Sequence, residues 1–121
     1  LVPTSIPFYL YKKYSVYYRE KNKKVVIGWI GSGRAHYRNL QVLVPVFKEL
    51  LKENLPFKYV LIGGMGEKKI HSLFSGIEGL DFEIIDELNW SDPSQVPSHI
   101  QKFDIGVFPY FEDSEWNRGK C

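Results

Sequence analysis

The sequence predicts an α/β fold, a Rossmann-like parallel sheet with crossover helices. Short and almost wholly apolar runs recur along the chain, as in strands that a parallel sheet buries on both faces. Segments with a helical period separate these runs, and this alternation of strand and helix is typical of a parallel sheet. Two of the runs end in glycine-rich turns, at residues 31–33 and 63–66.

The first cycle of this pattern covers residues 24–53. Residues 24–31 form a nearly all-apolar run that ends in glycine and predict the first buried strand. Residues 37–53 place leucines and Phe47 on one helical face, which predicts an amphipathic helix. Pro45 lies inside that helix, where it removes a backbone donor, and we expect a kink there.

The cycle then repeats twice. The remaining elements that we expect, in chain order, are a buried strand at 58–62, a short helix at 67–75, a strand nearer the sheet edge at 81–86, a helix within 94–103 that begins late because of Pro97, and a strand at 104–109.

Composition excludes several classes of protein. The chain has 121 residues, the size of one domain, and a net charge of +2, which does not indicate a nucleic-acid partner. Its single cysteine, Cys121, excludes a disulfide within the chain, and no apolar run is long enough to cross a bilayer. We therefore expect a cytoplasmic protein.

The glycine turn after the first strand suits a diphosphate. In parallel sheets ligands bind beyond the carboxyl ends of the strands, and a turn such as Gly31-Ser32-Gly33 that opens a helix presents amide donors to an anion. Arg34 and Arg38 follow, and their guanidinium groups suit phosphate oxygens. The alternative is a tight turn followed by two surface arginines.

More specific fingerprints are absent from the sequence. The pattern from Gly31 through Gly33 to His36 lacks the third glycine of the dinucleotide motif, and no P-loop follows any strand. The three histidines, His36, His71 and His99, have no metal-ligand spacing, so we predict no metal site.

Four segments in order carry a family resemblance. They are residues 2–6 (VPTSI), 27–32 (IGWIGS), 59–64 (YVLIGG), and 103–109 (FDIGVFP) followed by 116–121 (WNRGKC). Together they resemble the C-terminal domain of GT-B fold glycosyltransferases, in the retaining, nucleotide-sugar-using type that includes family 4. The resemblance covers nearly the whole chain.

The resemblance implies a truncated donor-binding domain. Residues 1–24 would form the interdomain hinge, and residues 25–121 a nucleotide-sugar-binding domain that is incomplete at its C-terminus. The donor substrate would be a nucleoside-diphosphate sugar, with no further cofactor and no metal. The acceptor would bind a missing N-terminal domain, so we expect the fragment to be inactive alone.

The resemblance also assigns residues to the site. Those that it implies for the diphosphate are Gly31, Ser32, Gly33, Arg34, Arg38 and Lys120, and those for the nucleotide pocket are Gly63, Gly64, Trp90 and Tyr110. No catalytic residue is identified, because the glutamate pair of the family is expected to begin near Gly119, where no glutamate occurs, and the chain ends before the second could appear. Relatives carry an arginine where this chain has Ser32. Asp104 and Trp29 are interpreted as structural and core residues.

Two other functions stay open. A non-catalytic Rossmann-like module would use residues 8–24, where tyrosines alternate with basic residues, to hold a partner protein or a peripheral membrane surface. A GT-B nucleotide-sugar epimerase would bind the same donor without an acceptor.

Overall fold

A computed structural model describes residues 7–14, 24–112 and 115 of the chain. Predictions that concern Lys120 and the segments 2–6 and 116–121 fall outside these residues. The described elements, in chain order, are α1 (Phe8–Lys13), β1 (Val25–Ile30), α2 (Gly33–Gln41), α3 (Leu43–Lys52), β2 (Phe57–Ile62), α4 (Lys68–Ser75), β3 (Phe82–Ile85), α5 (Gln95–Ile100) and β4 (Ile105–Gly106). No helix among them is long and apolar enough to cross a membrane.

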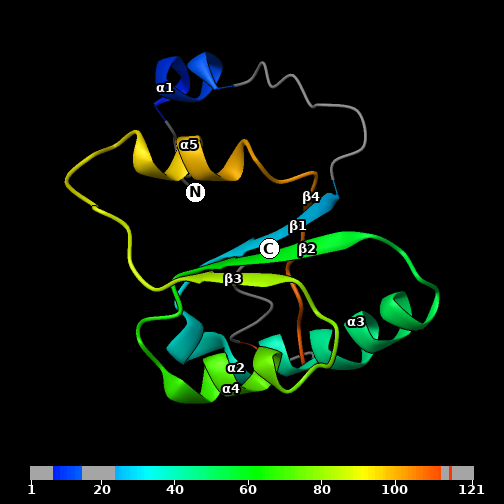
Figure 1. Cartoon of the computed structure of the whole chain (residues 1–121). Coiled ribbons are helices and arrows are strands. Elements are labelled where there is room, and N and C mark those ends of the chain that lie inside the picture. Colours follow the sequence, from blue (N-terminus) through cyan, green and yellow to red (C-terminus); the bar gives the residue numbers. More distant parts are fainter. Residues whose placement is uncertain (1–6, 15–23, 113–114, 116–121) are drawn as a thin grey trace.

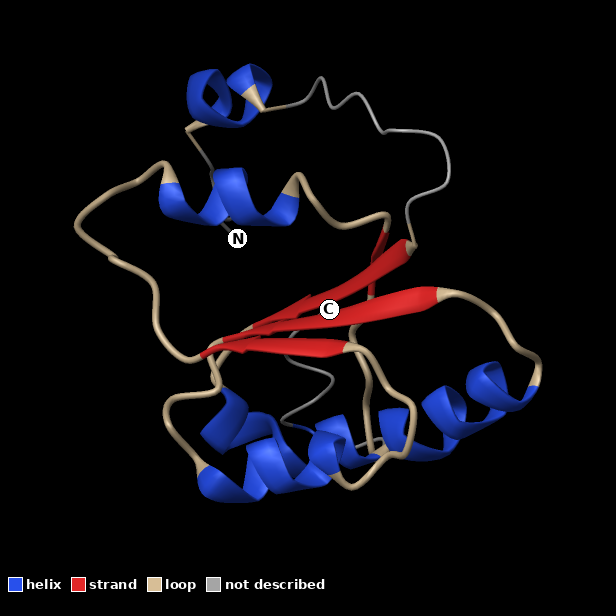
Figure 2. Ribbon diagram, viewed as in Figure 1, coloured by secondary structure: helices blue, strands red, loops and turns tan. Residues whose placement is uncertain are grey.

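The strands form one parallel sheet in the order β3-β2-β1-β4. Helices α2, α3 and α4 cover one face of the sheet, and α1 and α5 lie on the opposite side (Figure 1). Figure 2 shows the resulting layers of helix, sheet and helix. The predicted α/β, Rossmann-like fold is therefore confirmed, and β3 lies at a sheet edge as expected.

This strand order creates a switch point next to β1. The chain first proceeds outward from β1 through β2 to β3, and it then crosses to the other side of β1 to form β4. The connection to β4 runs through α5, on the opposite side of the sheet from α2 to α4 (Figure 1), whereas the segment that leaves β4 reaches α2, where Phe111 N donates to Asn39 Oδ1. In open α/β sheets such a point, at the carboxyl ends of the strands, is where ligands bind.

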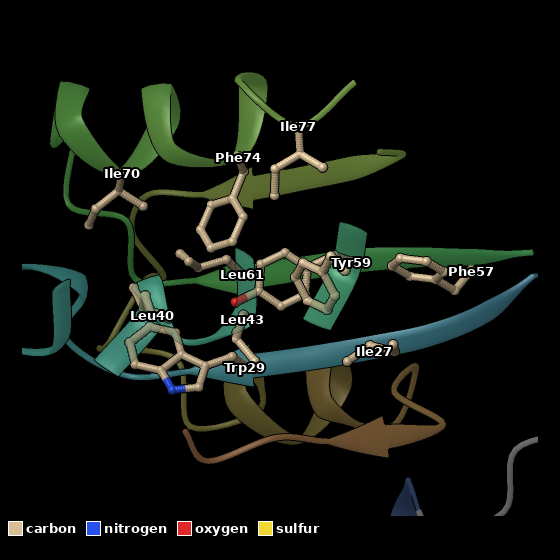
Figure 3. Close-up of a cluster of buried hydrophobic side chains, with 11 residues drawn as sticks. Ile27, Trp29, Leu40, Leu43, Phe57, Tyr59, Leu61, Ile70, Phe74 and Ile77 are labelled. Carbon is tan, nitrogen blue, oxygen red and sulfur yellow. The ribbon is translucent and has the colours of Figure 1, made fainter. Parts of the chain in front are cut away.

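The core lies between the sheet and helices α2 to α4 (Figure 3). Side chains two positions apart on a strand point to the same face, and Ile27 and Trp29 of β1 both point into this core. The prediction that Trp29 is a core residue is therefore confirmed. Phe47 of α3 and Phe74 of α4 pack against Tyr59 of β2, with ring centroids 4.7 and 4.9 Å away. Burial of each phenylalanine contributes about 1.5–3 kcal/mol.

On the opposite face of β1, Gly28 allows close packing of a side chain on the strand backbone. A Cβ atom at Gly28 would lie 2.1 Å from the ring of Phe103, so the phenylalanine that follows α5 packs directly on the backbone of β1. Close packing of this kind requires the missing side chain. Gly28 thus brings the segment before β4 against the sheet.

Pro45 and Pro97 each lie in the first turn of a helix, contrary to both predictions for these prolines. The predicted helix at 37–53 is two helices, with a break at Val42, and Pro45 occupies the third position of α3. Pro97 likewise occupies the third position of α5, so the predicted late start of that helix is wrong. In both cases the reason is that the first turn of a helix has no backbone acceptor for its N–H groups, so proline costs little there.

Strand β4 is shorter than the predicted strand at 104–109. Its ladder covers Ile105 and Gly106, and one more hydrogen bond joins Val107 N to Gly28 O. Asp104 precedes it, and its carboxylate accepts a 2.6 Å hydrogen bond from Val26 N, while its own N–H donates to Val26 O. The structural interpretation of Asp104 is confirmed.

Candidate functional site

The glycine turns after β1 and β2 are locked together. Gly33 N donates a 2.8 Å hydrogen bond to Gly63 O, and Gly31 N donates to Ile62 O. Gly63 has a φ of +97°, and a Cβ atom there would lie 1.8 Å from Gly31 O. These glycines therefore serve close backbone packing, which is the tight-turn alternative that the sequence left open.

Other amide groups of the first turn remain available. The N–H groups of Ser32, Arg34 and Ala35 donate to no group in the described part of the chain. They lie at the start of α2, where the helix dipole favours negative charge. The amide donors that this turn offers therefore belong to Ser32, Arg34 and Ala35 and not to the glycines.

A pocket of about 400 Å³ opens beside this turn, at the carboxyl ends of β1, β2 and β3. We call it the main pocket. Its lining residues are Ile30, Gly31, Ser32, Ile62, Gly63, Met65, Asp86, Glu87, Leu88 and Trp90. The hydroxyl of Ser32 lies 3.2 Å from the sulfur of Met65, and Trp90 is 73% exposed. Its volume lies within the range of small-molecule sites.

Asp86, directly after β3, is the charged residue best fixed in the main pocket. Its Oδ1 accepts hydrogen bonds from Gly66 N at 2.9 Å and from Nε2 of His71 at 3.1 Å. These hydrogen bonds hold the pKa of Asp86 below its usual range, and the bond from the Gly66 amide has a larger effect than the one from the His71 side chain. Asp86 is therefore an ionised acceptor at neutral pH.

A second, smaller pocket lies at the switch point itself. This switch-point pocket, of about 210 Å³, is lined by Trp29, Ile30, His36, Phe108, Pro109 and Tyr110. His36 lies edge-on to the Trp29 indole, with ring centroids 5.7 Å apart. Ile30 lines both pockets, so the two lie on either side of the end of β1.

The two arginines predicted for the diphosphate occupy different places. The Nε of Arg34 lies 2.5 Å from a carboxylate oxygen of Glu67, the residue that precedes α4. The guanidinium of Arg38 lies over the ring of Phe111, 6.0 Å from its centroid, beyond β4. Arg34 thus lies at the entry of α2, whereas Arg38 lies one helical turn further along, on the side of β4.

The structure brings some of the predicted site residues together and separates others. Gly31, Ser32, Gly63 and Trp90 line the main pocket. Gly33 and Gly64 are buried beneath it, where Gly64 packs against Asp86 and Ile84. Tyr110 lines the switch-point pocket instead. The predicted nucleotide pocket with Trp90 and Tyr110 is therefore divided between two cavities.

Sequence reasoning missed three residues of the site. The sequence places Asp86 only at the end of a strand and Met65 in a glycine-rich turn, and it excludes His71 from a metal site without predicting another role. The signal that identifies Asp86 is its place as the first polar residue beyond the carboxyl end of a strand. No sequence signal identifies the pairing of His71 with it, since the two meet only through the packing of α4 on the sheet.

The described residues contain no cluster of histidine, cysteine, aspartate or glutamate suited to a metal ion. Comparison of the chain with protein-family models, with curated proteins and with solved structures finds no match. What the site binds must therefore be inferred from its own geometry and from the resemblance of its motifs.

Proposed function

We propose that the chain binds a nucleoside diphosphate at the carboxyl edge of its sheet, as the donor-binding domain of a glycosyltransferase. The observation that carries this proposal is the first turn of α2. The amide groups of Ser32, Arg34 and Ala35 have no acceptor among the residues that the structure describes, and Ser32 also lines the main pocket, so an anion at the helix start would lie next to space for a nucleoside.

The resemblance supplies the reaction. In a glycosyl transfer the glycosidic bond to the nucleoside diphosphate breaks, and negative charge develops on the leaving diphosphate. Amide donors that already point at this group stabilise the charge as it forms, without reorganising during the reaction. Glu67 holds the Nε of Arg34, and the two Nη groups of this side chain have no partner in the described part of the chain, so they remain as further donors.

Nucleotide binding is the direct test of this function. UDP, GDP and ADP are each added to the chain while its thermal unfolding is followed. A ligand at a hundred times its dissociation constant adds about 2.7 kcal/mol to the free energy of unfolding. A shift with at least one nucleotide is expected, and no shift with any of the three contradicts the proposal.

A proline substitution tests the amide site itself. Ala35 is the third residue of α2, the same position that Pro45 and Pro97 occupy in α3 and α5, so Ala35→Pro removes one free N–H without breaking the helix. Loss of one hydrogen bond to a charged group weakens binding about tenfold or more. Ala35→Ser keeps the amide and is the control. Equal nucleotide affinity in both variants would place the phosphates elsewhere.

A second candidate function rests on α1. This helix exposes Phe8 at 70% and Tyr9 at 73%, and Lys12 and Lys13 lie in its last turn. Aromatic side chains beside basic ones suit an anionic membrane surface. In that case the double substitution Phe8→Ser and Tyr9→Ser abolishes sedimentation with anionic vesicles, while nucleotides leave the melting temperature unchanged.

A further inference from the structure

The main pocket combines apolar and acidic lining residues. The apolar ones are Ile30, Ile62, Met65, Leu88 and Trp90, and the acidic ones are Asp86 and Glu87. Apolar walls suit a planar aromatic ring, whose polar edge must then find partners in the same cavity. The partner groups of this pocket decide which ring fits.

Asp86 lines this pocket, and two donors orient its carboxylate. Its Oδ1 is held by Gly66 N and His71 Nε2, while its Oδ2 has no partner in the part of the chain that the structure describes. The two donors orient the carboxylate and keep it ionised, so it can accept hydrogen bonds and cannot donate one. The side chain is 40% exposed and therefore accessible to a ligand.

The nucleobases differ in what they offer to such an acceptor. Guanine places two adjacent donors, its ring N1–H and its exocyclic amino group, on one edge. Uracil offers a single N3–H between two carbonyl oxygens, and those oxygens repel a carboxylate. Adenine has a ring nitrogen acceptor beside its amino group, so it too brings an acceptor against the carboxylate.

We infer that the main pocket selects a guanine nucleotide and that Asp86 is the residue that determines this specificity. The inference rests on the proposed function, because it places the base in the main pocket when the diphosphate lies at the start of α2. An ionised aspartate that is buried against an unsuited base loses its solvation without a hydrogen bond in return. The pocket therefore accepts guanine and rejects uracil and adenine.

Isothermal titration of the full chain with four diphosphates tests the inference. GDP is compared with UDP, with inosine diphosphate, which lacks the exocyclic amino group, and with 2′-deoxy-GDP, which lacks a ribose hydroxyl. Loss of one hydrogen bond to a charged group reduces affinity about tenfold or more. We expect GDP to bind at least tenfold more tightly than UDP or inosine diphosphate, and 2′-deoxy-GDP to match GDP.

Two variants assign the preference to a residue. Asp86→Asn keeps an oxygen for Gly66 and His71 but replaces the second acceptor oxygen, and we expect it to lose the preference for GDP over inosine diphosphate. Glu78→Gln removes a carboxylate at an exposed position after α4, away from the lining of the main pocket. It should keep the preference, and melting temperatures confirm that both variants fold.

The possible results distinguish a failure of this inference from a failure of the proposed function. If GDP, UDP and inosine diphosphate bind equally, the inference is wrong and the proposed function stands. If GDP binds much more tightly than 2′-deoxy-GDP but not than UDP, the carboxylate binds the ribose and not the base, and the inference is again overturned. If no nucleotide binds, the proposed function fails as well.

Discussion

The side-chain oxygen of Asn39 in α2 accepts a 2.9 Å hydrogen bond from the backbone N–H of Phe111, 72 positions further along the chain. Asn39 is 6% exposed, and its amide nitrogen lies 3.1 Å from Nδ1 of His36. One buried amide therefore ties the segment after β4 to the helix after β1. It fixes the two sides of the switch-point pocket relative to each other.

Asn39→Ala should break this tie. The substitution leaves the N–H of Phe111 without its acceptor and removes a buried amide, so we expect the free energy of unfolding to fall by about 1–3 kcal/mol. Urea unfolding measures the change. Gln41→Ala, at an exposed position of the same helix, should stay within about 0.5 kcal/mol of the original chain. A similar loss in both variants would assign the effect to α2 as a whole.

Gly63→Ala should be among the most damaging small substitutions in the chain. Its new methyl group would lie 1.8 Å from Gly31 O, and its φ of +97° is unfavourable for any side chain. Gly79 is a matched control, because its φ is +81° but a Cβ there meets nothing within 4 Å. Gly79→Ala should cost about 1 kcal/mol of backbone strain, and Gly63→Ala clearly more in urea unfolding. Equal costs would show that the turns are not locked together.

Tyr59→Phe should stabilise the protein. Tyr59 is fully buried in the core (Figure 3), and its hydroxyl has no hydrogen-bond partner in the described part of the chain. Removal of a buried, unpaired hydroxyl should raise the free energy of unfolding by about 1 kcal/mol. Thermal and urea unfolding measure this gain, with Tyr37→Phe, at a partly buried position, as control. A loss of stability would mean that the hydroxyl has a partner in solution.

The same residue predicts a response to alkaline pH. Burial raises the pKa of the Tyr59 hydroxyl far above its ordinary value. The folded state keeps this proton, whereas the unfolded chain releases it near pH 10. The stability that Tyr59 contributes is thus complete below that pH and declines as the pH rises above it. The advantage of the Tyr59→Phe variant should accordingly widen between pH 9 and pH 11 on that scale, and an advantage that does not change with pH would contradict this.

Asp86 predicts the opposite response in acid. Its pKa in the folded chain is lowered, mainly by the Gly66 amide, so its contribution to stability is present above the ordinary pKa of about 3.9. That contribution is lost as the pH falls through the lower folded value. Asp86→Asn should show a shallower fall in stability below about pH 4. The Ser94 hydroxyl lowers the pKa of Asp92 as well. Because Asp92 is present in both chains, its contribution to the pH dependence cancels when the two are compared. Equal slopes would contradict the assignment.

The elements of the fold were predictable because their signals are local. The apolar run around Ile27 and the helical period that places Phe47 inward need only neighbouring residues to be recognised. The boundaries at Pro45 and Pro97 were misjudged, since proline disrupts a helix interior but not a first turn, and the sequence alone does not fix the turn. The strand order followed from no local pattern.

The site was predictable only where it coincides with strand ends. Gly31, Ser32, Gly63 and Trp90 line one pocket as expected, because the carboxyl ends of neighbouring parallel strands meet at one edge. Tyr110 lies in the other pocket because β4 joins the sheet on the far side of β1. The predictions for a nucleotide, its diphosphate and an acceptor domain stay predictions.

The locked glycine turns give the site a fixed floor. Because Gly31 and Gly63 touch through their backbones, the turns after β1 and β2 cannot separate without losing the hydrogen bonds that join them. A ligand that lies on this floor meets amide groups already in place, so little conformational entropy is lost there on binding. The indole of Trp90 in the pocket wall is 73% exposed, so it has room to change its rotamer. The rigid and the adjustable parts of the pocket thus belong to different loops of the same small sheet.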